Sequence, residues 1–203
     1  MQDQLPGLTR TRMSGGTAAW NGLLLVLVLL GPIRWALDLD RYELWHDETY
    51  SLAAAAGLGL EQQDFTGPFK HADLLEKSTF RNAVSACLRN DGGNGILHVI
   101  LLRQWIQIAP RTVFGIRLSS FIAACITLLV IGLFVIDIFG DMRAALLTTA
   151  LIAHNPLMTA AAVEVRSYPL AILFSSAAAW LMLRLMLGKR FLSDTLLFAL
   201  LAS

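Results

Sequence analysis

Long hydrophobic runs, separated by short polar stretches, dominate the chain. Four of them cover residues 17–37, 118–136, 144–163 and 167–183, and the last three contain no Asp, Glu, Lys or Arg. Each reaches or approaches the roughly 20 residues that a helix needs to cross a bilayer. A fifth run, 191–203, has only 13 residues. The pattern predicts an all-α, polytopic membrane protein with four full transmembrane helices and a truncated fifth.

The first hydrophobic run also has features of a secretory signal peptide, since Arg10 and Arg12 precede it. Its 21 residues are enough to span the membrane. No small-residue cleavage site follows at once, because Trp35, Leu37 and Leu39 are bulky. We therefore expect an uncleaved signal-anchor helix and a single membrane domain over residues 1–203.

The segment 94–109 is harder to interpret, because it is short and polar on one side. At about 100° per residue, Arg103, Gln104 and Gln107 share one helical face, with apolar residues over most of the rest. An ionisable group deep in lipid is costly, so a helix lying at the membrane interface is favoured over a short, tilted span.

The distribution of charge supports this topology. If 94–109 lies flat, the ends of the spans that face the N-terminal side carry Arg10, Arg12, Arg143, Arg184, Lys189 and Arg190. Short loops rich in Lys and Arg belong in the cytoplasm. We therefore expect a cytoplasmic N-terminus in the inner (plasma) membrane. The 38–115 loop, which holds ten of the fifteen acidic residues, then faces outward and carries juxtamembrane helices.

Composition agrees with a membrane protein and excludes other classes. The chain is 56% hydrophobic and only 15% charged, whereas soluble domains average about 25% charged residues. A net charge of +1 argues against nucleic acid as a partner. Cys87 and Cys125 fall in the outer loop and in a hydrophobic run, so we expect two free thiols, with Cys87 reachable from outside.

Two adjacent carboxylates, Asp47 and Glu48, stand out in the stretch "WHDETYSL" of the outer loop. Trp45 and Tyr50 flank them, as expected near lipid headgroups, and the following "SLAAAAGLGL" predicts an interfacial helix. Carboxylates in an outer loop can be simply solvated. In a partly dry setting they can instead act as a general base.

A second polar cluster, "EVRSYP", follows the third span. The predicted topology brings Glu164 and Arg166 to the same membrane face as Asp47, at a corner between two helices, so the two clusters can meet. Arg166 can hold an anion such as phosphate, with Glu164 orienting it. The alternative is a helix-end ion pair of little energetic consequence.

Other polar residues have structural alternatives. His98 and Arg103, on the interfacial helix, either steer an acidic headgroup or anchor the helix. Arg117 is expected to mark the interface before the second span, and Pro156 to kink the third. The chain has no Gly-rich phosphate loop, HExxH or GxSxG, so soluble nucleotide-dependent chemistry is not indicated.

Five stretches occur in the order "WHDETYSL", "GNGILHVILLRQW", "IRLSSFIAA", "GDMRAALLTTALIAHNP" and "EVRSYPL". In this order the chain, from residue 41 to about 187, resembles the polyprenyl-phosphate-dependent membrane glycosyltransferases of the protein O-mannosyltransferase and aminoarabinose transferase group. It departs from them at "GNGIL", which replaces their proline pair. Those enzymes also continue through several further membrane helices.

The resemblance implies an inverting transfer of a sugar from a polyprenyl-phosphate donor to an acceptor hydroxyl on the outer face. Asp47 and Glu48 are then the catalytic carboxylates, with Asp47 as the base. The implied substrate-binding residues are Glu164, Arg166, Tyr168, His98 and Arg103. A divalent metal, Mg²⁺ or Mn²⁺, assists some distant relatives, and Asp47 and Glu164 could share one.

Two alternatives to an enzyme remain from the sequence. A chain that ends within its fifth helix can be a non-catalytic accessory or assembly subunit that keeps the glycosyltransferase fold. A transporter is less favoured, because the charged groups gather at one face and not near the midplane. Since 13 residues extend about 20 Å as a helix, we expect the isolated chain to need further helices or another subunit for turnover.

Overall fold

The structure, a computed structural model, describes residues 15–58, 79–93, 95–110 and 112–188. Within these ranges every regular element is an α-helix, which confirms the all-α prediction. The helices are α1 (Gly15–Asp38), α2 (His46–Ala55), α4 (Phe80–Asp91), α5 (Ile96–Ile108), α6 (Val113–Phe139), α7 (Met142–Ala153), α8 (Pro156–Val163) and α9 (Tyr168–Met186).

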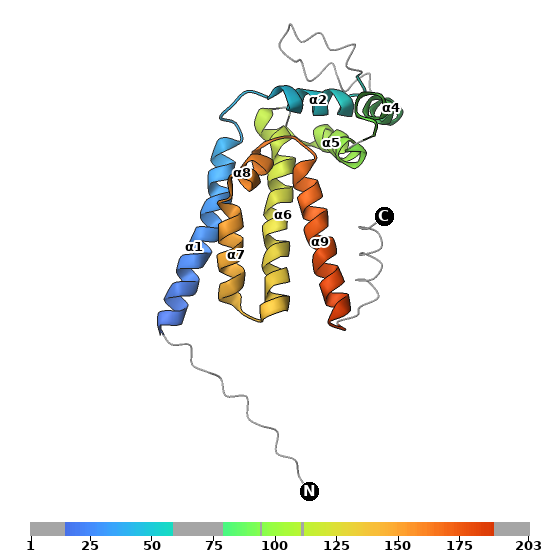
Figure 1. The fold of residues 1–203 in the computed structure, drawn as a ribbon. Coiled ribbons are helices and arrows are strands. Elements are labelled where there is room, and N and C mark those ends of the chain that lie inside the picture. The colour runs from blue at the N-terminus through green and yellow to red at the C-terminus, as the bar shows by residue number, and fades with distance from the viewer. Residues whose placement is uncertain (1–14, 59–78, 94, 111, 189–203) are drawn as a thin grey trace.

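The described helices form two parts (Figure 1). In the first, α1, α7, α6 and α9 run side by side, and α8 lies near one end of them; we call these five helices the bundle. In the second, α2, α4 and α5 lie across that same end of the bundle; we call them the cap layer. The cap layer comes from the region predicted to be an outer loop with juxtamembrane helices.

Three helices are long and apolar enough to cross a membrane: α1 from Thr17, α6 and α9. A fourth crossing exists if α7 and α8 count as one span, but the two helices are bent by 67° at their junction. The run 144–163 is therefore not the continuous helix that its hydrophobicity predicts. Asn155 begins a new helix there, because its side chain accepts a hydrogen bond from the Leu157 backbone N–H at 2.9 Å and Pro156 suits a first helical position.

Within the bundle, small residues allow the helices to approach closely. A Cβ atom added to Gly31 of α1 would lie 2.7 Å from the Ala153 Cβ of α7. Trp35 of α1 is fully buried, and its indole N–H donates to the Thr159 hydroxyl of α8 at 3.2 Å. A hydrophobic cluster around this contact joins the bundle helices, and its buried members are Trp35, Ala124, Leu128, Ala153, Met158 and Ala162.

A separate hydrophobic cluster lies between the helices of the cap layer and at their contact with α6, and it includes Leu52, Cys87, Leu102 and Ile116. Cys87 is only 2% exposed in this cluster. The expectation that Cys87 can be reached directly by reagents is therefore wrong, because α4 turns this side chain toward α2 and α5. Both Cys87 and Cys125 are free thiols, as predicted.

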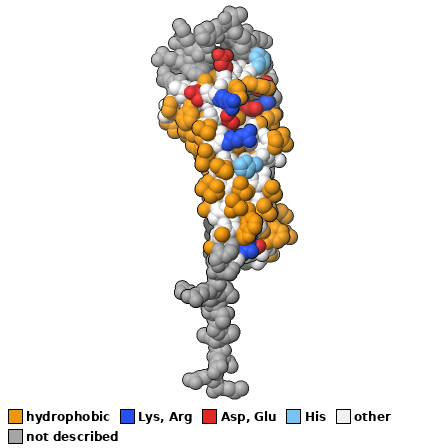
Figure 2. Space-filling view, turned by 90° about the vertical axis from the view of Figure 1, so that its left-hand side faces the viewer, with side chains coloured by type: hydrophobic (Ala, Val, Ile, Leu, Met, Phe, Trp, Pro, Cys, Tyr) orange, Lys and Arg blue, Asp and Glu red, His pale blue; other side chains and the backbone are white. Residues whose placement is uncertain are grey.

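The two parts differ in surface chemistry. On the face shown in Figure 2, charged and histidine side chains gather near the cap layer, whereas hydrophobic side chains cover most of the described surface below them. Among the large apolar side chains of the bundle that are more than half exposed are Leu129, Leu151 and Met182. Such a surface suits contact with lipid. The fifth run, 191–203, and the expected cytoplasmic charges of Arg10, Arg12, Lys189 and Arg190 lie outside the described residues.

Candidate functional site

Helix α2 begins at His46, so the two carboxylates occupy its first turn instead of preceding an interfacial helix. Negative side chains are favourable at this end of a helix, where backbone N–H groups have no partner within the helix. Glu48 is the third residue of α2, and its Oε2 accepts a hydrogen bond from the Trp45 backbone N–H at 2.8 Å. This bond fixes the start of the helix and the direction in which each carboxylate points.

Glu48 is buried between the cap layer and the bundle, with an exposed fraction of 1%. Its carboxylate forms a two-point ion pair with Arg117 of α6, whose Nη2 and Nε donate at 2.7 and 2.9 Å. The Val165 backbone N–H donates to the same carboxylate at 2.9 Å. Glu48 therefore joins α2, α6 and the segment between α8 and α9.

Arg117 also donates hydrogen bonds to backbone carbonyls of the linker between α1 and α2. Its Nη1 donates to the carbonyls of Leu39 and Tyr42, and its Nη2 donates to the carbonyl of Glu43. The sequence pattern predicts Arg117 at the interface before the second span but does not predict its pairing with Glu48. The available signal was a lone arginine near the start of a long apolar helix, on the membrane face where the acidic cluster was expected.

Asp47 points in a different direction and pairs with Arg166 of the α8–α9 corner. The Arg166 Nη1 to Asp47 Oδ2 distance is 2.7 Å, and the two side chains are 32% and 43% exposed. The Arg166 guanidinium also lies 4.7 Å from the centre of the Tyr168 ring, in a cation–π contact. The prediction that the two polar clusters meet is confirmed. This pair remains partly open, whereas the Glu48–Arg117 pair is closed.

Glu164 lies next to this corner, as the residue that follows α8. No ion pair joins it to Arg166 in the described part of the chain; Asp47 takes that place. Burial, and then the negative charge of Glu48, raise the pKa of the Glu164 carboxyl, while the charge of Arg166 opposes the shift. The expected orienting role of Glu164 toward Arg166 therefore falls to Asp47.

The two predicted substrate-binding residues of α5 are both buried. Arg103 is 6% exposed and donates to the Ala55 carbonyl of α2 at 3.2 Å, which corresponds to the anchoring alternative. It does not share the environment of Gln104 and Gln107, which are exposed. His98 is 7% exposed and faces a cavity.

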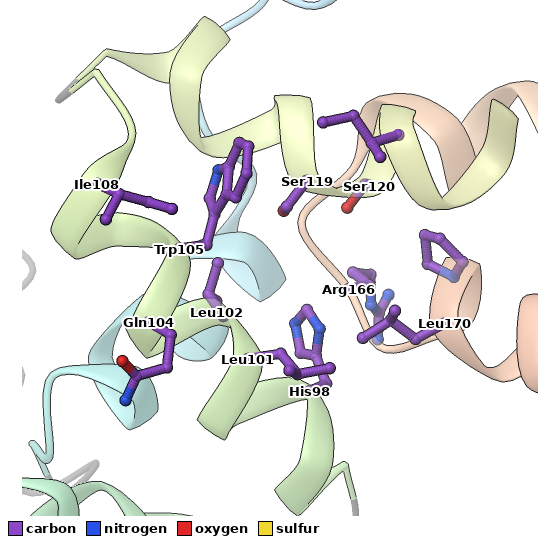
Figure 3. A pocket seen from close by; sticks show the side chains of 12 residues that line it. His98, Leu101, Leu102, Gln104, Trp105, Ile108, Ser119, Ser120, Arg166 and Leu170 are labelled. Atoms are coloured by element: carbon purple, nitrogen blue, oxygen red, sulfur yellow. The ribbon is translucent and has the colours of Figure 1, made fainter. Parts of the chain in front are cut away.

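That cavity, which we call the α5 pocket, lies between α5, α6 and the α8–α9 corner and has a volume of about 300 Å³. Figure 3 shows His98, Ser119, Ser120 and Arg166 around it. Most of the remaining lining is apolar: Leu101, Leu102, Ile108, Ile122, Pro169 and Leu170. Arg166 therefore connects the Asp47 ion pair with an apolar pocket.

A second cavity, of about 410 Å³, lies on the α1 side of the same corner. It is more polar, and Arg34, Tyr42, Trp45 and Glu164 are among the residues that line it. The segment from Glu164 to Arg166 therefore contributes to both cavities, with Glu164 at one and Arg166 at the other.

The residues present do not fit the metal site that was expected. The metal was expected between Asp47 and Glu164, but the Asp47 carboxylate is held by Arg166, and Glu164 lines the cavity on the α1 side. Within the described ranges, no group of three or more His, Cys, Asp or Glu side chains is arranged to hold a metal ion.

Together these features define an all-helical protein with apolar helices suited to a membrane and a polar site at one end of them. No protein-family model matches the chain, and no curated protein or solved structure matches it. What the site does must therefore be inferred from its own chemistry.

Proposed function

We propose that this protein is a membrane glycosyltransferase that transfers a sugar from a polyprenyl-phosphate donor to an acceptor hydroxyl. The observation that carries the proposal is the Asp47–Arg166 ion pair beside the apolar α5 pocket, at the junction of the cap layer and the bundle. It puts a carboxylate next to a planar cation suited to phosphate, and this cation lines a pocket suited to hydrocarbon. A lipid-linked sugar phosphate needs these three features together.

The proposal includes four crossings, with α7 and α8 together forming the third, and a cytoplasmic N-terminus in the inner (plasma) membrane. The cap layer and the 38–115 region then lie on the outer face. Support comes from the basic residues at the far end of the bundle, Arg143 and Arg184, since short cytoplasmic loops are rich in such charges. The sugar donor would then react outside, at headgroup depth.

In the proposed reaction, Asp47 accepts the proton of the acceptor hydroxyl as that oxygen attacks the anomeric carbon. The bond between this carbon and the phosphate oxygen breaks with inversion, and the polyprenyl phosphate leaves with the electron pair. Arg166 binds the phosphate as its charge develops. Because Arg166 holds Asp47 in the structure, an arriving phosphate would compete with Asp47 for the guanidinium and release the carboxylate to act as the base.

Glu48 serves a different purpose in this proposal from the catalytic one first expected. A carboxylate that is buried and bonded to Arg117, to Val165 and to Trp45 has no free position for an acceptor proton. We assign it to positioning: it fixes the start of α2 and with it the place of Asp47. Tyr168 supports Arg166 through its ring, and Glu164 faces the cavity on the α1 side.

A non-catalytic accessory subunit, working with another membrane protein, is the alternative. The observation in its favour is the ion pair itself, because an Asp47 held by Arg166 can also be a structural link between α2 and the α8–α9 corner. The two functions differ in whether the chain itself supports turnover.

Sugar transfer in membranes tests the proposal. Membranes with and without the protein are supplied with radiolabelled polyprenyl-phosphate sugars, and label in acceptors and free polyprenyl phosphate are both measured. We expect transfer only where the protein is present. Transfer of equal rate in its absence, or no transfer from any such donor, would favour the accessory role.

Arg166→Lys sharpens the same assay. A lysine keeps the charge but loses the planar fork of donors that matches phosphate. We expect a weaker apparent affinity for the lipid donor, by roughly tenfold, and little change in the dependence on acceptor. An unchanged affinity for the donor would reduce Arg166 to a structural ion pair.

A further inference from the structure

His98 presents an unusual feature in the α5 pocket: a buried ring nitrogen without a partner. The side chain is 7% exposed, and its Nε2 has no hydrogen-bond partner among the described residues. Leaving a buried polar atom unpaired is unfavourable, so such atoms in folded proteins call for an explanation. A ligand that completes the bond is one such explanation.

The position of the ring supports this explanation. His98 extends from α5 toward the space between Ser119, Ser120 and Arg166, as Figure 3 shows. Arg166 lines the same pocket from the α8–α9 corner. A ligand atom between them would therefore meet a cation and an imidazole together.

The imidazole is neutral at physiological pH. Burial lowers the pKa of His98 to about 4. Of the charged groups nearby, Arg166 lines the pocket, and Arg103, on the same helix as His98, is directed to the Ala55 carbonyl. No carboxylate lines the pocket among the described residues. A neutral imidazole can donate one hydrogen bond through Nε2 without adding a charge.

The apolar lining of the α5 pocket indicates what the rest of the ligand is. Beyond these polar groups the pocket is mostly aliphatic, and the rim residues Leu101, Ile108 and Ile122 are 41%, 80% and 38% exposed. The pocket therefore opens between apolar side chains. Its volume of about 300 Å³ lies at the lower end of the range for small-molecule sites. It can hold only the first part of a long chain.

We propose that His98 is a neutral hydrogen-bond donor that, together with Arg166, binds the phosphate of an isoprenoid carrier, while the α5 pocket holds the hydrocarbon nearest that phosphate. This inference rests on the proposed function and adds a specificity-determining residue to it. Arg166 supplies the charge. His98 supplies a directed bond that distinguishes a phosphate oxygen from a purely hydrocarbon ligand.

Direct binding tests this role without sugar or acceptor. The full chain in nanodiscs of zwitterionic lipid is titrated with farnesyl phosphate, with farnesol and with inorganic phosphate. We expect farnesyl phosphate to bind most tightly, because only this probe satisfies both the pocket walls and the polar groups. Equal binding of farnesol would overturn a role for the phosphate, and equal binding of inorganic phosphate would overturn a role for the pocket.

Two variants of His98 test whether its Nε2 atom contributes to phosphate binding. His98→Leu removes the donor and should weaken farnesyl phosphate binding roughly 10- to 100-fold, as expected for a hydrogen bond to a charged group. His98→Gln places an amide donor near the Nε2 position and should retain affinity within about threefold. Wild-type affinity in the Leu variant, or an equal loss of farnesol and farnesyl phosphate binding, would overturn the proposal.

The pH dependence tests whether the donor is neutral. The phosphate of the probe titrates with a pKa of about 6, so the useful quantity is the ratio of wild-type to His98→Gln affinity, in which this effect cancels. We expect a constant ratio from about pH 5.5 to 8. A ratio that rises as the solution is acidified would show a charged imidazole and contradict the proposal.

These results separate the inference from the proposed function. If farnesyl phosphate binds through His98 but membranes transfer no sugar, the glycosyltransferase fails and the lipid-phosphate site stands. If sugar is transferred but His98→Leu binds the probe normally, only the role of His98 is lost.

Discussion

The bundle and its junction with the cap layer are held together by different kinds of contact. In the bundle, large apolar side chains such as Leu129 and Leu151 point outward, while Ala124 and Ala153 are buried between helices. At the junction, the ion pair of Glu48 and Arg117 is buried, with exposed fractions of 1% and 3%. Close packing of small and apolar side chains joins the bundle helices, whereas directed hydrogen bonds set the position of α2 against α6.

The difference extends to the two neighbouring carboxylates. Glu48 faces inward and is held by Arg117 of α6. Asp47, one residue earlier, pairs with Arg166 in a partly exposed position near the α5 pocket. Consecutive residues of a helix are separated by about 100°, so one can face the core and the other the site. A rigid anchor next to a partly exposed carboxylate is suited to positioning a catalytic group.

Breaking the junction should have the largest effect on stability. Glu48→Gln leaves the Arg117 charge buried without its partner, which typically costs about 3–5 kcal/mol. Thermal unfolding in detergent should therefore show a greatly lowered midpoint. The matched control is Asp38→Asn, which removes the more open ion pair between Asp38 and Arg41. The Arg41 side chain is 64% exposed and that of Asp38 is 19% exposed. This control should change stability by less than about 1 kcal/mol. Equal effects of the two variants would show that burial of the pair does not matter.

Acid should destabilise the junction through His98. The unfolded chain binds a proton at an ordinary histidine pKa of 6.5, whereas burial in the folded protein lowers that pKa to about 4. The folded state therefore binds fewer protons, and stability is lost as the pH falls from about 6.5 to 4, by roughly 3 kcal/mol. Measuring the stability of the wild-type protein and of His98→Gln across this pH range tests the expected loss. Parallel curves for the two proteins would contradict a buried, neutral His98.

A smaller effect is expected in the bundle, where close contact replaces hydrogen bonding. A side chain at Gly31 meets Ala153, so Gly31→Val should cost about 1–3 kcal/mol through overpacking of α1 against α7. Gly22 of the same helix has nothing within 4 Å of an added Cβ. Gly22→Val carries the same change in helix propensity and is the control. If both valines are tolerated alike, α1 does not pack closely against α7.

The sequence predicted the bundle better than the junction. Length and hydrophobicity are enough to identify α1, α6 and α9, because lipid-facing helices are apolar over most of their surface. The break between α7 and α8 was expected only as a kink at Pro156. Its 67° angle depends on the capping of α8 by Asn155 and on its packing against neighbouring helices, which a hydropathy pattern does not contain.

For the site, the sequence predicted which segments meet but not how their side chains pair. Charge distribution was enough to bring the 164–166 corner near Asp47. The rotation of α2 about its axis decides that Glu48 faces Arg117 and Asp47 faces Arg166. That rotation is set by tertiary packing, so two adjacent acidic residues looked equivalent. The burial of Arg103 against Ala55 was hidden for the same reason.

The most direct test of the account is sugar transfer by Asp47→Asn, compared with Asp40→Asn, an exposed carboxylate of the nearby linker. Because Asp47 is proposed as the general base, its loss should lower transfer from polyprenyl-phosphate donors by about 10²–10⁴. The unfolding midpoint should stay close to wild type, since the ion pair is partly exposed. Asp40→Asn should retain both properties. Transfer at the wild-type rate by folded Asp47→Asn protein would contradict the account.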